Sequence, residues 1–173
     1  MYEELKTICD SLAANPSIRV AIFRGAGDKA FVSGSDIQQF VDLKKDEAYE
    51  VAVDNIFRSL QQLPMPTIAL IEGLAVGSGL LIATACDFRI STPDARFGIP
   101  VARTLGNCLS PSNLSWISAH LGVPMVKKML LTSELIKAPE LLASAYLYET
   151  VAAEEITQAA DALANKLAAL API

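Results

Sequence analysis

The stretch TIALIEGLAVGSGLLIATACDFRIST, residues 67–92, decides the fold of this chain. Its first part, TIALIEG at 67–73, is an almost wholly apolar run that ends in glycine and predicts a buried strand. The glycine-rich turn LAVGSG leads into an apolar helix, LLIATACD at 80–87, and FRIST at 88–92 predicts a third short strand. A buried strand, a glycine turn and a buried helix in succession indicate an α/β protein.

The same alternation extends outward from this stretch in both directions. Upstream, IRVAIFRG at 18–25 predicts another buried strand, and a loop then leads to a short helix that opens at Asp36. Further helices are expected at residues 2–14, 46–63, 113–122, 124–133, 139–147 and 154–170, extended segments at 134–137 and 148–151, and a loop at 93–112. We therefore expect residues 1–173 to form a single domain with a mostly parallel sheet covered by helices.

Composition excludes several classes of protein. The chain has 173 residues, a formal net charge of −5, 52% hydrophobic residues, 19% charged residues and a mean hydropathy of +0.37. An acidic chain without a Lys/Arg cluster is not expected to bind nucleic acid, and the high apolar content excludes disorder. The longest apolar-rich stretch, residues 74–86, is too short and too polar to span a bilayer. With no signal peptide visible, we expect a cytoplasmic protein.

Histidine and cysteine usage narrows the chemistry further. His120 is the single histidine, so a Ser-His-Asp or Cys-His mechanism would need it, yet its place near a helix end favours a structural role. The three cysteines, Cys9, Cys86 and Cys108, form no CxxC motif, so we expect no metal or redox site.

Two glycine-rich turns, VSGSD at 32–36 and VGSG at 76–79, share one local design. Each follows a strand-like stretch and precedes a helix, whose first backbone N–H groups have no partner within the helix. Two such helix starts facing one another would direct two N–H donors at one oxygen and stabilise an oxyanion. The alternative is that both turns serve only close packing of a helix against a strand. Neither turn fits a dinucleotide-binding, P-loop or nucleophile-elbow motif.

At these residues the chain resembles the crotonase family, the enoyl-CoA hydratase/isomerase superfamily. The resemblance is carried by IRVAIFRGAGDKAFVSGSDIQQF, by PMPTIALIEGLAVGSGLLIATACDFRISTPDARFGIP and by MLLTSELIKAPELLASAYLYETV, in the family's order and spacing. It implies an α/β fold with the repeated ββα spiral core of ClpP- and crotonase-like proteins. The parts that the family adds before and after this core are expected to be missing from residues 1–173, which would make this a partial crotonase-like domain.

The resemblance also implies a chemistry, in which an acyl-CoA thioester is bound and its enolate is stabilised between two backbone N–H groups. By position, these donors are the amides of Ser35 and Ser78, where the family usually has alanine and glycine. The implied substrate-binding positions are Ser33, Gly34, Asp36, Ile37, Gly77, Leu81, Pro100 and Val101. The thioester is the substrate, so no separate cofactor is expected. A homotrimer or hexamer acting in fatty acid metabolism is the implied context.

The acid/base positions depart from the family's hydratases. Leu81 and Val101 stand where the resemblance places two glutamates, and Ala102, the alternative match to the second, is no carboxylate either. Water addition needs groups that activate water and protonate carbon. Cys108 is a candidate for a replacement base, but a packing role is favoured for it. Two further readings therefore stay open: an acyl-CoA-binding or interaction protein with impaired catalysis, and a purely structural subunit of an oligomer.

Overall fold

The structure, a computed structural model, describes residues 1–27, 29–34, 47–104 and 109–170. Its strands are β1 (Ala21–Arg24), β2 (Ala30–Val32), β3 (Thr67–Ile71), β4 (Leu74–Val76), β5 (Phe88–Ser91), β6 (Arg96–Gly98), β7 (Ile136–Lys137) and β8 (Glu149–Thr150). Its helices are α1 (Tyr2–Ala13), α3 (Glu47–Gln61), α4 (Ser78–Ala85), α5 (Val101–Thr104), α6 (Pro111–Leu121), α7 (Val123–Thr132), α8 (Ala138–Ala143) and α9 (Ile156–Ala168). The alternation of strands and helices confirms the predicted α/β class.

The described strands form two sheets, whereas the sequence predicts one. Each sheet has four strands, in the orders β1-β3-β5-β8 and β2-β4-β6-β7, and every pair is parallel except β6 with β7. From β1 to β6 successive strands alternate between the sheets, so this part of the chain builds both sheets together as repeated ββα units. Gly73, with φ of 67°, makes the corner between β3 and β4, and a Cβ there would lie 2.1 Å from the Lys29 carbonyl oxygen.

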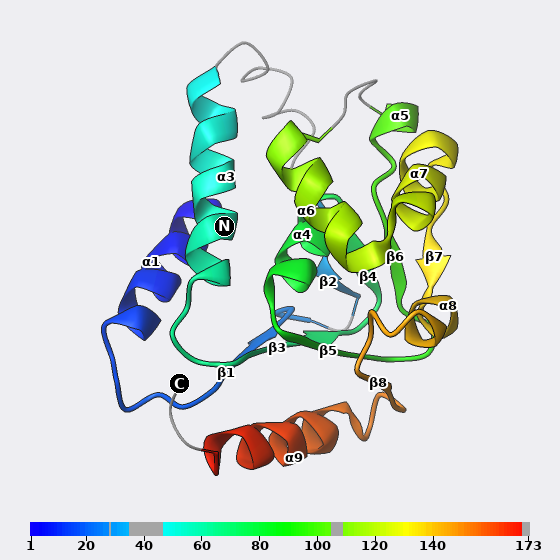
Figure 1. Cartoon of the computed structure of the whole chain (residues 1–173). Coiled ribbons are helices and arrows are strands. Elements are labelled where there is room, and N and C mark those ends of the chain that lie inside the picture. The colour runs from blue at the N-terminus through cyan, green and yellow to red at the C-terminus, as the bar shows by residue number, and fades with distance from the viewer. Residues whose placement is uncertain (28, 35–46, 105–108, 171–173) are drawn as a thin grey trace.

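The first sheet is covered on both faces (Figure 1). Side chains alternate along β3, so Ile68 and Leu70 pack with Ile156 and Leu163 of α9. The intervening β3 side chains belong to the larger core on the opposite face, which also contains α4. Burial on both faces explains why β3 reads as a continuous apolar run.

The region predicted as a loop, residues 93–112, contains β6 and α5. These elements have three and four residues, too short for a recognisable period. Helix α6 also begins at Pro111, two residues before the expected start at residue 113. Ser110 is the N-cap, and its Oγ accepts the Asn113 N–H at 3.3 Å.

The carboxyl end of α4 is closed by Arg89. Its guanidinium donates to the carbonyl oxygens of Cys86 and Asp87, and its Nε donates to the Tyr146 carbonyl at 2.7 Å. The guanidinium also stacks 4.7 Å from the centre of the Tyr146 ring. The Tyr146 hydroxyl and Thr84 Oγ1 share a buried hydrogen bond of 2.7 Å. These contacts fix the axis of α4 and hence the position of its opposite end.

Two buried ionisable side chains in this region, Cys86 and Tyr146, should make the protein less stable in alkali. Burial raises the pKa of the Cys86 thiol and of the Tyr146 phenol to about 12, above 9.0 and 10.0. Both groups are uncharged when protonated, so the unfolded chain loses its protons first. The free energy of unfolding should therefore fall with rising pH above about pH 9, by up to about 1.4 kcal/mol per pH unit for each group.

Urea unfolding at several pH values checks this expectation. Cys86→Ala should make the decline between about pH 9 and pH 10 shallower, because the phenol ionises later. A free energy of unfolding that stays constant from about pH 8 to pH 11 would contradict it.

None of the helices in the described ranges has both the length and the apolar character needed to cross a bilayer. Among the same residues, no group of three or more His, Cys, Asp or Glu side chains is placed to hold a metal ion. His120, at the end of α6, contacts its own helix: its Nδ1 lies 3.0 Å from the Trp116 carbonyl oxygen. This contact agrees with the structural role predicted for it.

Candidate functional site

The two glycine turns predicted to face one another lie side by side where they are described. Gly34 and Gly77 both have positive φ, of 107° and 58°. A Cβ at Gly77 would lie 3.7 Å from the Cα of Gly34, and a Cβ at Gly34 would lie 3.4 Å from the Val76 carbonyl oxygen. The turn after β2 and the turn before α4 are therefore in backbone contact. Glycine adopts a positive φ at little cost, which explains its presence at both positions.

Helix α4 begins inside this contact. The Leu80 and Leu81 N–H groups donate to the Gly77 carbonyl at 3.1 and 3.3 Å, whereas the amides of Ser78 and Gly79 have no acceptor among the described residues. Every residue of α4 is buried. The positive end of the helix dipole is thus weakly screened by solvent, and two free donors project from it. An oxygen carrying negative charge is the complementary ligand.

A third segment is joined to these two turns through Gly98. The Gly77 N–H donates to the Gly98 carbonyl at 2.9 Å, which ties the start of α4 to the end of β6. Pro100 and Val101, both half-buried, follow after Ile99, and Val101 begins α5. Leu81 lies one turn into α4, on the same helix face as Ser78, and is 4% exposed. The structure thus brings Gly34, Gly77, Ser78 and Leu81 together at one helix start, and Pro100 and Val101 follow the strand end that is bonded to it.

Several predicted site residues fall outside the described ranges: Ser35, Asp36, Ile37 and Cys108. Ser33 is described and exposed at the end of β2. Of the two backbone amides expected to bind the oxyanion, the structure therefore describes that of Ser78, and that of Ser35 remains a prediction. Ala102, the alternative second acid/base position, is exposed on α5.

Two described carboxylates that flank the second glycine turn in sequence, Glu72 and Asp87, have structural partners. Glu72 pairs with Arg24 at 2.8 Å and bridges the ends of β1 and β3. Asp87 accepts the Thr67 N–H and hydroxyl, both at 2.8 Å, and so ties the end of α4 to β3. These contacts give both residues structural roles.

Asp54 of α3 is a carboxylate that no sequence motif singles out. Its Oδ1 accepts the Asn113 side-chain amide at 2.6 Å, and both its oxygens lie 3.2 Å from Ser110 Oγ. It thus fastens α3 to the first turn of α6. Residues so far apart in sequence leave no periodic pattern that predicts their contact.

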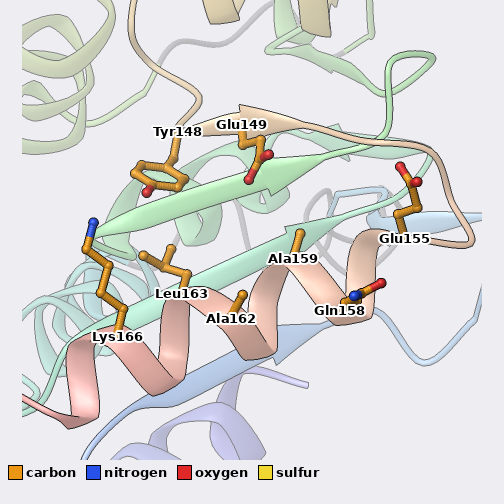
Figure 2. Close-up of a pocket in the computed structure, with 8 residues that line it drawn as sticks. All are labelled: Tyr148, Glu149, Glu155, Gln158, Ala159, Ala162, Leu163 and Lys166. Atoms are coloured by element: carbon orange, nitrogen blue, oxygen red, sulfur yellow. The ribbon is translucent and has the colours of Figure 1, made fainter.

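A separate groove lies between β8 and α9 (Figure 2). It has a volume of about 380 Å³ and is lined by Tyr148, Glu149, Glu155, Gln158, Ala159, Ala162, Leu163 and Lys166. None of the predicted site residues that the structure describes lines it. Helices α4 and α9 cover opposite faces of the first sheet (Figure 1), so this groove is not the site formed by the glycine turns.

Comparison with known proteins finds related sequences along nearly the whole chain. The Short-chain-enoyl-CoA hydratase of Clostridium acetobutylicum is 31% identical over 99% of this chain and 66% of its own length. The Crotonyl-CoA hydratase of Syntrophomonas wolfei is 30% identical over 95% of this chain and 64% of its own length. The chain therefore spans just under two thirds of these curated relatives.

Solved structures show the same relationship. An enoyl-CoA hydratase/carnithine racemase from Magnetospirillum magneticum matches 99% of this chain and 66% of its own chain, with a TM-score of 0.94 and 31% identity. An enoyl-CoA hydratase from Bacillus anthracis matches 99% of this chain and 67% of its own, with a TM-score of 0.89 and 28% identity. All of residues 1–173 match the sequence profile of the enoyl-CoA hydratase/isomerase family. The chain belongs to that family, and its fold is crotonase-like.

Proposed function

We propose that this chain binds an acyl-CoA thioester with the thioester carbonyl oxygen at the start of α4, and stabilises the enolate of that thioester. The observation that carries the proposal is the close approach of the Gly34 and Gly77 turns beside the free amides of Ser78 and Gly79. An oxyanion is stabilised most by donors that are fixed before it forms. The Ser78 amide is one such donor, and the Ser35 amide is the second in this proposal.

The reaction expected of such a site is that of an acyl-CoA lyase or isomerase. Holding the carbonyl oxygen between two N–H groups makes the neighbouring α-carbon more acidic, because the charge left by the departing proton moves onto that oxygen. The names of the family and of the related proteins point to hydration of enoyl-CoA. For this chain we expect little hydratase turnover, because Leu81 and Val101 supply no proton donor or acceptor.

The second candidate function is acyl-CoA binding without turnover. Leu81 is 4% exposed and belongs to the main core, which favours a position used for packing over one used for proton transfer. In this reading the oxyanion site is kept, and the chain holds acyl-CoA without converting it. A structural subunit, as a homotrimer or hexamer that forms without ligand, is the third reading.

Two assays separate these functions. Calorimetric titration with acetyl-CoA and octanoyl-CoA tests binding, and crotonyl-CoA hydration tests turnover. Saturable binding with turnover of about 1–10³ per second identifies a working hydratase, and saturable binding without turnover identifies the binding protein. Absence of binding would overturn both. Light scattering that shows trimers or hexamers without any acyl-CoA binding would support the structural reading.

A further inference from the structure

The side chain of Ser78 is an unexplained polar group at the start of α4. Its hydroxyl oxygen is buried, the residue is 9% exposed, and the oxygen has no hydrogen-bond partner among the described residues. Buried hydroxyl groups in folded proteins are normally hydrogen-bonded, because an unpaired one has lost its water without compensation. A group of this kind at a helix start calls for a ligand that completes it.

The geometry of a helix places this hydroxyl near the free amides. Each Cα–Cβ bond of an α-helix tilts toward the helix N-terminus, and Ser78 is the first residue of α4. Its side chain therefore leans toward the end at which its own N–H and that of Gly79 are unpaired. Rotation about the single Cα–Cβ bond moves the hydroxyl among three staggered positions. One of these positions would direct the hydroxyl toward the helix start, where an oxygen bound to the free amides would lie.

We infer that the Ser78 hydroxyl donates a third hydrogen bond to the thioester oxygen, in addition to the backbone amides. The inference rests on the proposed function and assigns a further catalytic group to the same site. Glycine at position 78 would offer the amide alone. A hydroxyl donor bound to a developing oxyanion strengthens as the charge grows, so it favours the enolate over the neutral thioester.

Acetoacetyl-CoA is a direct probe of this third donor. Its C2 proton lies between two carbonyl groups and leaves to solvent on ionisation, giving an enolate that absorbs in the near ultraviolet. At one fixed pH, the ratio of bound enolate to bound ketone should fall about tenfold in Ser78→Ala relative to the unchanged chain. Affinity for coenzyme A without an acyl group should not change.

Ser91→Ala is the matched control. Ser91 of β5 also has a buried hydroxyl without a partner among the described residues, but it lies outside the glycine turns. Both variants remove an unpaired buried hydroxyl, so both should unfold at the same temperature as the unchanged chain or above it. Only Ser78→Ala should lose enolate.

The outcomes distinguish this inference from the proposed function. An enolate ratio in Ser78→Ala equal to that of the unchanged chain, or an equal fall in both variants, overturns the role of the hydroxyl and leaves the proposed function standing. If the unchanged chain binds coenzyme A but gives no enolate, the proposed function fails and the inference fails with it.

Discussion

Gly79→Ala should lower the free energy of unfolding by about 3 kcal/mol or more, although alanine usually favours a helix over glycine. A Cβ at Gly79 would lie 2.1 Å from the Val32 carbonyl oxygen and 2.9 Å from the Val32 Cβ. Val32 cannot retreat freely, because it is paired with Ala75 of the neighbouring strand. Urea denaturation followed by circular dichroism measures the loss.

Gly27→Ala is the matched control for this substitution. A Cβ at Gly27 would meet nothing within 4 Å, and φ there is not positive. Its effect should stay within about 0.5 kcal/mol. If Gly79→Ala and the unchanged chain unfold at the same urea concentration, α4 does not start against β2 as described.

The double substitution Leu81→Glu with Val101→Glu should raise the rate of crotonyl-CoA hydration by about 10²-fold or more. The resemblance to the family's hydratases places glutamates at these two positions, where they activate water and protonate carbon. In this structure Leu81 lies one turn into α4, and Val101 lies three residues after Gly98, whose carbonyl accepts the Gly77 N–H at the start of that helix. Steady-state hydration kinetics give the measurement.

Leu81→Gln with Val101→Gln controls for size and polarity without a titratable group. Both double variants should be less stable than the unchanged chain, because Leu81 is buried and each variant places a polar side chain in the core. A gain confined to the glutamate variant supports the assignment of these two positions to proton transfer. An equal rate in the two variants, or no gain in a folded glutamate variant, contradicts it.

Much of the fold can be predicted from the sequence because its signals are local. The run at 67–73 is apolar throughout, and β3 is buried at every position, so pattern and structure agree. The sequence predicts a helix after the glycine turn, at 80–87, and α4 begins two residues earlier, at Ser78. The division into two sheets cannot be predicted in the same way, because it depends on contacts such as that of Gly73 with Lys29, far away in sequence.

The candidate site shows the same contrast between local and distant signals. The contact of Gly34 with Gly77 joins two glycine-rich turns that the sequence predicts to face one another. The hydrogen bonds from Ser110 and Asn113 to Asp54 leave no local pattern in the sequence, because they join two helices through side chains alone. The unpaired hydroxyl of Ser78 has none either, because only the packing around it shows that it lacks a partner among the described residues.

A structure with acetyl-CoA bound tests the proposed oxyanion site most directly. We predict that the thioester oxygen lies about 2.7–3.1 Å from the backbone nitrogen of Ser78, beside the turn that contains Gly34. A thioester bound elsewhere, such as in the groove between β8 and α9, with the Ser78 amide left without a ligand, would contradict the proposal.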